Sequence, residues 1–225
     1  MIINHTHRFI FVHVPKTAGT SIVSALSKFS TYRDLEIGGT PLGEAIQPFM
    51  QTRFGLRKHS TSAEIRHVVG QYSFQSYFSF CIVRSPFSRL QSAYHFLRGW
   101  KQYPEEFAAE FDKYDSFDAF LKSELWMIKP GPDGIFLPQT HWINDPKSGL
   151  PLPRYVGKLE QLDSVVETLS NSIFKIDGAI KIGIKNKTPR YEPISEWPTK
   201  MVSKITEFYA SDFSQLEYSD DPNEA

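Results

Sequence analysis

The sequence has a single cysteine, no net charge and no long hydrophobic run. Cys81 is the only cysteine among 225 residues, so no disulfide can form within the chain. It lies in the apolar run 77–83, where a small buried side chain is the expected role. The 25 basic and 25 acidic residues cancel, so the overall charge favours neither nucleic acid nor an anionic membrane. Any binding site for an anion therefore has to be built locally.

No segment approaches the run of about 20 apolar residues that a membrane-spanning helix needs. No basic region with a long apolar stretch follows Met1, which leads us to expect a cytoplasmic protein. The length of 225 residues suits one compact domain, residues 1–225, with a sizeable core. The 18 Phe, 10 Tyr and 4 Trp residues can fill that core or line a ligand pocket, and core packing is the commoner use.

Apolar runs and helix caps predict strands that alternate with helices. Residues 9–14 are expected to form a buried strand that Pro15 ends. Thr20 or Ser21 is expected to cap the helix that follows. A second buried strand is expected at residues 77–83, because this run is apolar and rich in aromatic side chains.

A helix is expected to follow the second strand, because Ser85-Pro86 provides a cap and then proline at the first helical position. The remaining expected elements are helices at 61–69 (opened by a Thr61–Glu64 capping box), 105–113, 117–125, 162–172 and 199–209, and strands at 154–157 and 179–184. Residues 38–60 and the long loop 129–153 are expected to be irregular. The alternation predicts an α/β fold with a mainly parallel β-sheet flanked by helices on both faces.

The segment Val14-Pro15-Lys16-Thr17-Ala18-Gly19-Thr20-Ser21 lies between the first strand and its helix. The N–H groups at a helix start and the helix dipole form a natural anion site. Lys16 adds a positive charge, Gly19 allows close approach, and three hydroxyl groups add donors. The segment is not a Walker A loop, because its lysine precedes the glycine. An ordinary helix after a strand would look much the same if this segment stood alone.

A second segment with anion-binding character follows the strand at 77–83. Arg84 stands where that strand ends, and Ser92 lies about two turns into the next helix, on the face it shares with Ser88. An arginine fork with a nearby hydroxyl suits a phosphate monoester. The alternative is a strand-terminal arginine paired with a carboxylate, next to a solvent-facing serine.

Taken in order, the two segments resemble the sulfotransferases that use 3′-phosphoadenosine 5′-phosphosulfate (PAPS), in the branch with heparan- and chondroitin-type carbohydrate enzymes and bacterial relatives. The resemblance implies a fold akin to P-loop NTPases. It implies that Lys16, Thr17, Ala18, Gly19, Thr20 and Ser21 hold the 5′-phosphosulfate, and that Arg84 and Ser92 hold the 3′-phosphate. It also implies a loop with Lys187 and Thr188 that closes over the cofactor. Ser85 departs from the Asp or Asn of many relatives.

Sulfuryl transfer is expected to be in line, with a loose transition state like that of phosphoryl transfer. The transferred group carries less charge than a γ-phosphoryl group, so no metal is expected. His5, His7 and His13 have no carboxylate or cysteine partner nearby in the sequence, and structural or solvent-facing roles are expected for them. Lys16 is expected to stabilise the charge that develops on the leaving 5′-phosphate, which makes it both a binding and a catalytic residue.

The acceptor hydroxyl has to lose a proton, and histidine is the usual base near neutral pH. His59, which directly precedes a capped helix between the two motifs, is the favoured candidate. His67, within that helix, and His141, in the long loop, are the alternatives. The acceptor is expected to be a glycan or small molecule, and its identity stays open. Aromatic residues that could stack on a sugar or fill the core are Trp100, Tyr103, Trp126 and Trp142.

Two other functions stay open. A kinase-like nucleotide phosphotransferase would need a Walker lysine-Ser/Thr pair and carboxylates for magnesium, and neither pattern is found. A non-catalytic protein that binds PAP, the 3′,5′-bisphosphate product of PAPS, would keep both phosphate motifs and tolerate loss of His59.

Overall fold

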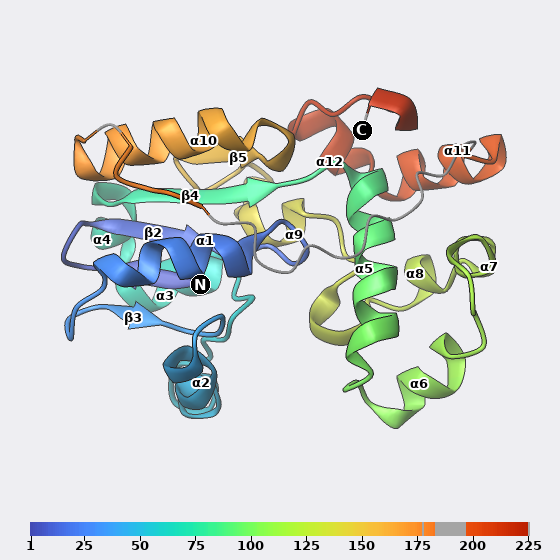
Figure 1. The fold of residues 1–225 in the computed structure, drawn as a ribbon, viewed down its shortest axis with the longest axis horizontal. Helices are drawn as coiled ribbons and strands as arrows, with labels where there is room; N and C mark the ends of the chain where they lie inside the picture. Colours follow the sequence, from blue (N-terminus) through green and yellow to red (C-terminus); the bar gives the residue numbers. More distant parts are fainter. Residues whose placement is uncertain (177, 183–196, 225) are drawn as a thin grey trace. The chain divides into compact units, whose positions relative to one another are not determined.

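The computed structural model describes residues 1–176, 178–182 and 197–224. Contacts divide the chain into two compact units. The first, which we call the sheet unit, contains Met1–Val83 and Gln139–Asn186. The second, the helical unit, contains Arg84–Pro138 and Lys187–Ala225, and its described elements are all helical (Figure 1). No helix in the described part of the chain is both long and apolar enough to cross a membrane.

The sheet has five strands in the order β3-β1-β2-β4-β5. Their bounds are β1 Ile2–Asn4, β2 Phe9–Val12, β3 Leu35–Glu36, β4 Phe78–Val83 and β5 Tyr155–Lys158. β2, β4 and β5 pair in parallel, whereas β1 pairs antiparallel with β2 and β3. The α/β class is confirmed, but the sheet is mixed rather than mainly parallel. β1 and β3 have three and two residues, too few for a recognisable sequence period.

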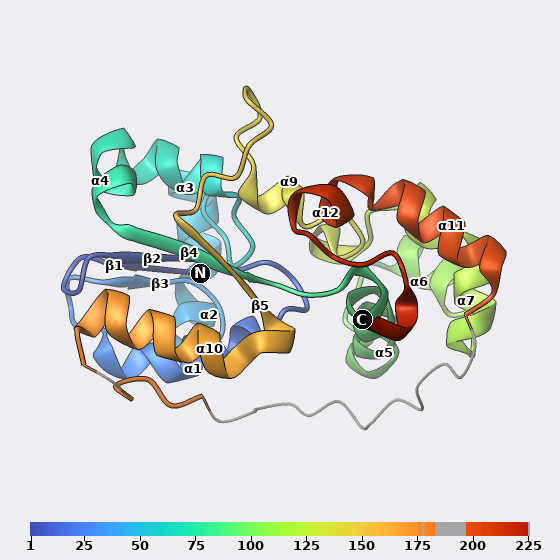
Figure 2. The same cartoon turned by 90° about the horizontal axis from the view of Figure 1, so that it is seen from above.

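The two long apolar runs form the central strands β2 and β4, as predicted. Phe11 faces Phe80 across the parallel pair, and their ring centroids are 5.1 Å apart. Figure 2 shows α1 and α10 on one face of the sheet and α3 and α4 on the other. Apolar side chains from α1 and α10 pack on Phe11 and Phe80. Burial on both faces explains why these strands are continuously apolar instead of alternating.

The helices of the sheet unit are α1 Gly19–Leu26, α2 Pro41–Phe54, α3 Ser62–Val69, α4 Gln71–Ser76, α9 Thr140–Ile143 and α10 Leu162–Leu169. Short turns extend α1 at Ser27–Phe29 (η1) and α10 at Ser170–Phe174 (η4), and Leu159–Gln161 (η3) precedes α10. The predicted capping box of α3 is present: Glu64 N–H donates to the Thr61 side chain, and Thr61 N–H donates to the Glu64 carboxylate.

The helix α2 contradicts the prediction that residues 38–60 are irregular. Thr40 caps it by accepting a hydrogen bond from Gly43 N–H at 3.0 Å, and Pro41 occupies the first helical position. Gly55 ends it in the left-handed conformation, with φ of 70°. Gly43 is its one buried residue, so α2 has no apolar stripe for a periodicity argument to detect. The sequence features that indicate this helix are the residues at its two ends, Thr40-Pro41 and Gly55.

Two further predictions in the sheet unit were wrong. The cap of α1 is Ala18, not Thr20 or Ser21, because Ala18 is left-handed and the helix already begins at Gly19. Residues 179–182 of the expected strand 179–184 lie in no strand, and the last two residues are outside the described part of the chain.

The long loop 129–153 contains the single turn of α9. Cys81 is fully buried, as predicted, and burial raises the pKa of its thiol far above the ordinary value.

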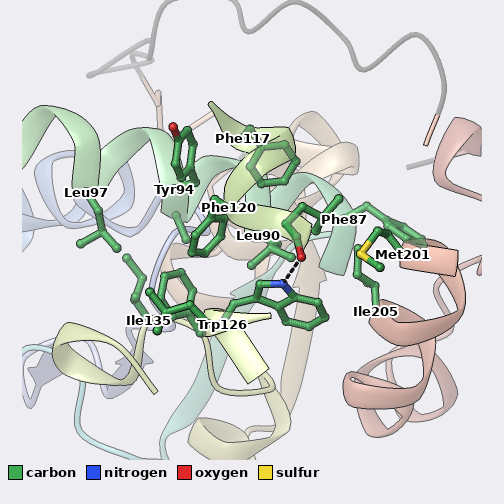
Figure 3. Packing of buried hydrophobic residues seen from close by; sticks show 14 of the residues in the cluster. Phe87, Leu90, Tyr94, Leu97, Phe117, Phe120, Trp126, Ile135, Met201 and Ile205 are labelled. Atoms are coloured by element: carbon green, nitrogen blue, oxygen red, sulfur yellow. Dashed lines mark hydrogen bonds between the residues drawn. The ribbon is translucent and has the colours of Figure 1, made fainter. Parts of the chain in front are cut away.

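The helical unit is held by an aromatic core (Figure 3). Its helices are α5 Pro86–Trp100, α6 Glu105–Phe111, α7 Phe117–Ser123, α8 Leu125–Ile128, α11 Thr199–Phe208 and α12 Ala210–Gln215, with turns at Pro132–Gly134 (η2) and Pro222–Glu224 (η5). Trp126 is fully buried, and its indole N–H donates to Leu121 O at 3.1 Å. The predicted helices at 105–113, 117–125 and 199–209 are confirmed to within two residues at each end.

A buried arginine anchors an irregular segment in the helical unit. Arg89 is 1% exposed, and its guanidinium donates to Ile135 O at 3.1 Å and to Leu137 O at 2.7 Å. The same group lies 6.0 Å from the ring centroid of Tyr209, whose hydroxyl donates to Phe136 O at 2.8 Å. A buried cation is tolerated only when it has hydrogen-bond or charge partners, and here two backbone carbonyls accept from the guanidinium.

A carboxylate clamps the turn between β1 and β2. Asp34 Oδ1 accepts hydrogen bonds from the N–H groups of His5 at 2.6 Å and Thr6 at 2.9 Å. Asp34 Oδ2 accepts from the Thr6 hydroxyl at 2.8 Å and from the N–H of Thr31, also at 2.8 Å. Partial burial alone would raise the pKa of Asp34, but the hydrogen bonds from Thr31 and Thr6 outweigh it and lower the pKa.

Replacing Asp34 with Asn should lower the free energy of unfolding at neutral pH by about 1–2 kcal/mol, because charge-assisted hydrogen bonds become weaker or are lost. A lowered folded-state pKa means that the carboxylate stabilises the fold above its unfolded-state pKa of about 4. That stabilisation is lost as the pH falls through the folded-state pKa. Chemical denaturation at pH 7 and at low pH measures both effects. Asp220→Asn, at an exposed position, is the matched control, and equal losses in the two variants would contradict the prediction.

Candidate functional site

The loop that follows β2 has an unusual backbone. Lys16 and Ala18 have φ values of 67° and 61°, a left-handed conformation that is rare for residues other than glycine. The Thr17 hydroxyl donates to Val14 O at 3.0 Å and closes the loop on itself. Strained backbone of this kind persists where the surroundings enforce it, and it concentrates at ligand-binding sites.

This backbone leads into the start of α1, where N–H groups lack partners within the helix. Gly19 and Thr20 are the first two helical residues, so their N–H groups have no carbonyl partner within the helix. A left-handed residue followed by a helical one makes adjacent N–H groups converge into a concave anion site, and Ala18-Gly19 has that arrangement. The helix dipole and the Lys16 ammonium group add positive charge. The arrangement can bind a phosphate or sulfate group.

Not every residue predicted for this cradle is accessible. Lys16, Ala18 and Thr20 are partly exposed. Thr17 is fully buried, and Ser21 is 5% exposed. Because the Thr17 hydroxyl is used inside the loop, Thr17 supports the loop's shape instead of offering its side chain to a ligand.

Gly19 is buried against the imidazole of His13. A Cβ atom at position 19 would lie 1.9 Å from His13 Nε2, far inside van der Waals contact. The close approach predicted for Gly19 is therefore made to a histidine ring of the same chain. His13 itself is 3% exposed, and its ring stacks on Phe11 with centroids 5.5 Å apart.

His59 is hydrogen-bonded to this same loop. Its Nδ1 lies 2.7 Å from His13 O. A carbonyl oxygen only accepts, so Nδ1 carries the proton and Nε2 keeps its lone pair. The pKa of His59 is lowered to about 3, mainly by burial. The N-terminal amino group, Lys58 and Arg57 act in the same direction, and the hydrogen bond to His13 partly opposes them. His59 is thus neutral at pH 7, in the tautomer that can accept a proton at Nε2.

The helix α2 holds the segment that carries His59. Gln47 Oε1 accepts a hydrogen bond from Lys58 N–H at 2.9 Å. The ammonium group of Lys58 forms an ion pair with Glu44 at 3.1 Å. The helix that sequence reasoning missed therefore supports the candidate base.

The two alternative histidines lie elsewhere on the sheet unit. His67 is exposed on α3, and His141 is exposed on α9. Partial burial lowers the pKa of His141, the charge of Glu64 opposes this effect, and the charge of Arg57 adds to it. Within the described chain, His59 is the one of the three that hydrogen-bonds to the loop after β2.

The second motif begins at the same sheet edge as the first, because β2 and β4 are parallel neighbours and Arg84 directly follows β4. Within the helical unit, Arg84 Nε donates to Ser88 Oγ at 2.9 Å, and Ser88 Oγ donates to Ser85 O at 3.3 Å. Ser88 therefore orients the arginine, a role that its position on the helix did not reveal. Ser92, one turn further on, is 4% exposed. Ser85 occupies the N-cap position and Pro86 the first turn, as predicted, but the Ser85 side chain makes no capping hydrogen bond.

Lys187 and Thr188 lie outside the described residues, so their contact with a cofactor stays a prediction. Across the described ranges, no group of three or more His, Cys, Asp or Glu side chains gathers where a metal ion could be held.

An α/β protein with an anion cradle at a strand end and a neutral histidine beside it has the parts of a group-transfer enzyme that acts on an anionic donor. A model of the sulfotransferase family matches residues 1–219. The chain therefore belongs to the sulfotransferase family, which confirms the resemblance found in its two motifs. Comparisons with curated proteins and with solved structures gave no match.

The lowered pKa of His59 predicts an acid sensitivity of folding. The unfolded state takes up a proton near the ordinary histidine pKa of about 6.5, whereas folded His59 stays neutral until about pH 3. The unfolded state then binds more protons, so stability falls as the pH falls through this interval. His59→Asn keeps an N–H donor for His13 O and removes the titrating ring. It should make the slope of unfolding free energy against pH shallower by at most about 1.4 kcal/mol per pH unit.

Chemical denaturation at a series of pH values between about 6 and about 4 measures that slope. His67→Asn, at an exposed position of α3, is the matched control and should keep the slope of the wild type. A His59→Asn slope equal to that of the wild type would show that His59 titrates alike in both states.

Proposed function

We propose that this member of the sulfotransferase family transfers the sulfuryl group of PAPS to a hydroxyl group of a carbohydrate acceptor, with His59 as the base. The observation that carries the proposal is the loop after β2. It combines Lys16, a left-handed Ala18 and the start of α1 with a direct hydrogen bond to His59. An anion cradle and a proton acceptor are thereby joined in one local structure. Because the family model spans both units, we treat them as one sulfotransferase domain.

The residues present fit the two anionic ends of PAPS. In the sheet unit, the N–H groups of Gly19 and Thr20 and the Lys16 ammonium group suit the 5′-phosphosulfate. In the helical unit, the Arg84 guanidinium, oriented by Ser88, suits a phosphate monoester, with Ser92 beyond it on the same helix face. The assignment of both motifs to one ligand rests on the resemblance to sulfotransferases that use PAPS, in which the two segments bind the two phosphate-bearing ends of the donor.

PAPS supplies the activated sulfuryl group, whose bond to the 5′-phosphate oxygen breaks as a bond from sulfur to the acceptor oxygen forms. In this proposal, His59 Nε2 takes the proton of the acceptor hydroxyl. The hydrogen bond from Nδ1 to His13 O fixes the tautomer and the orientation of the ring. Lys16 stabilises the negative charge that develops on the leaving phosphate, and the loop N–H groups stabilise the transferred group.

The pKa of His59 reaches a value that suits a general base only when the donor is bound. In the ligand-free chain, burial and neighbouring cations disfavour the protonated ring. A bound polyanion places negative charge beside the same cations and stabilises the protonated ring. The pKa of His59 should therefore rise towards the ordinary histidine value of about 6.5. The acid limb of the transfer rate should therefore lie below about pH 6.5.

The surroundings narrow the choice of aromatic residues for a sugar acceptor. Trp126 and Trp142 are 0% and 2% exposed, so they are core residues. Trp100 is 36% exposed and its ring stacks on Phe96, with centroids 5.6 Å apart. Of the four rings considered in the sequence, Trp100 and the partly buried Tyr103 remain the candidates for sugar stacking.

Donor binding is tested by titrating PAP into the wild type in the presence of EDTA and measuring the heat of binding. PAP should bind without metal, because the cradle and Arg84 supply the positive charge. ATP with magnesium, followed by thermal shift, tests the kinase-like alternative. The absence of PAP binding at about millimolar concentration, where a Kd corresponds to about 4 kcal/mol, would reject PAPS as the donor.

Arg84→Ala should weaken PAP binding by about 1.5–3 kcal/mol, because a charge-assisted contact to the 3′-phosphate is lost. Adenosine 5′-phosphosulfate lacks that phosphate, so its weaker binding should hardly change. Ser88→Ala should have a smaller effect of the same kind, since it removes one hydrogen bond that orients the guanidinium and leaves the charge in place. Arg98→Ala, which breaks a surface ion pair on the same helix, is the control. Equal losses of affinity for both ligands would show that Arg84 does not bind the 3′-phosphate.

His59→Asn should lower the transfer rate by about 10²–10⁴, the usual span for loss of a general base. Asparagine retains a donor for His13 O, so PAP affinity should stay within about threefold of the wild type, or about 0.7 kcal/mol. Lys16→Ala should harm both affinity and rate, because its charge meets the bound donor and the leaving group alike. The matched controls are His67→Asn and His141→Asn. A normal rate in His59→Asn together with a loss in His141→Asn would transfer the role of base to His141.

A further inference from the structure

The imidazole of His13 is packed between two parts of the proposed site. One edge lies against Gly19, the first residue of α1, where an added Cβ would come within 1.9 Å of Nε2 and 2.0 Å of Cδ2. Another side meets the ring of His59, with centroids 4.6 Å apart and planes at 63°. Phe11, on β2, stacks on the same imidazole. His13 thus touches the start of the helix, the candidate base and the central strand.

The need for glycine at position 19 comes from this ring. Gly19 does not have a positive φ, so its backbone conformation is open to any residue. The three atoms nearest to a Cβ at this position all belong to the His13 ring. Real Cβ atoms do not approach other heavy atoms so closely, and Phe11 and His59 also pack against the ring. The steric limit at position 19 is therefore set by the side chain at position 13.

His13 is also neutral, and this suits its location. Its Nδ1 is buried and, within the described chain, has no hydrogen-bond partner. Burial lowers the pKa of His13 well below its ordinary value, and the neighbouring His59 ring, the N-terminal amino group, Lys58 and Lys16 act in the same direction. An uncharged ring adds no positive charge that would compete with Lys16 for an anion. The side chain serves as a flat spacer, not as a charged contact.

We propose that His13 is a positioning residue that sets the spacing between the anion cradle at Gly19 and the base His59. It does so with its ring, which contacts both, and with its carbonyl oxygen, which accepts the His59 Nδ1 hydrogen bond. The reference to a base rests on the proposed function, whereas the contact between positions 13 and 19 does not. The sequence led us to expect only a structural or solvent-facing role for this histidine.

The spacing is tested by a double-mutant cycle in the full chain with Gly19→Ala, His13→Ala and the double variant, followed by thermal unfolding. Gly19→Ala should lower Tm by about 5–10 °C, because the new methyl group clashes with the ring. In the His13→Ala background the same change should cost little, because the ring is gone. Gly99→Ala, where nothing lies within 4 Å of the added Cβ, is the matched control and should not lower Tm. An equal cost of Gly19→Ala in both backgrounds would overturn the proposal.

The proposal can also be tested if one of these variants does not fold. If Gly19→Ala yields no soluble protein, recovery of soluble protein in the double variant supports the proposal, and failure of the double variant while His13→Ala folds overturns it. His13→Ser, which also lacks a ring, replaces His13→Ala if the latter does not fold. The unfolding measurements need no donor, so they remain decisive even if PAP does not bind.

A positioning role predicts a signature at His59 that general destabilisation would not produce. In the wild type, nitrogen NMR of the histidine rings should show His59 as a single Nδ1–H tautomer. In His13→Ala, the carbonyl of residue 13 still accepts from Nδ1, so the tautomer should persist. The ring loses its edge contact with the imidazole, so its signals should shift or broaden as it samples other orientations. The turnover rate in saturating PAPS should fall by at least about tenfold, with acceptor KM less affected. Unchanged His59 ring signals and an unchanged turnover rate in folded His13→Ala would overturn the role.

Discussion

The packing of the His13 ring against Gly19 is the contact on which the rest of the proposed site depends. It fixes where α1 begins relative to the end of β2, because nothing larger than glycine fits beside the ring. The chain then has to turn from β2 into α1 within six residues, 13–18, and it does so with Lys16 and Ala18 in the left-handed region. That turn in turn makes the N–H groups at the helix start converge. The strained backbone, the glycine at position 19 and the buried His13 ring therefore depend on one another.

The electrostatics of this region follow from the same packing. His13 and His59 are kept neutral by burial and by the positive groups around them. These include the N-terminal amino group and Lys58 beside both rings, Lys16 near His13 and Arg57 near His59. Two neutral imidazoles beside several cations form a local environment that an anion would stabilise. The chain carries no net charge, so the composition does not indicate this local positive charge. It arises from where the basic residues lie in the fold. A polyanionic donor is the kind of ligand that complements it.

Much of the fold could be predicted from the sequence, because its signals are local. The central strands are apolar runs, and α3 and α5 begin with recognisable caps at Thr61 and Ser85. The helix α2 was missed because it buries only Gly43, and β1 and β3 because they are too short to show a period. The motifs placed Lys16, Arg84 and their neighbours at strand ends correctly. What they could not show are contacts through space, such as His13 with Gly19, His59 with His13 O, and Ser88 with Arg84.

The central proposal is that the loop after β2 binds one anionic end of the donor and that the segment after β4 binds the other. The most direct test follows the backbone amide signals of the full chain by NMR while PAP is added in the presence of EDTA. The account predicts that the largest shifts fall on residues 16–21 and 84–92, with the amides of Gly19 and Thr20 changing most because they bond to phosphate oxygens. The signal of Gly99 should stay in place. Shifts confined to residues outside these two segments would contradict the account.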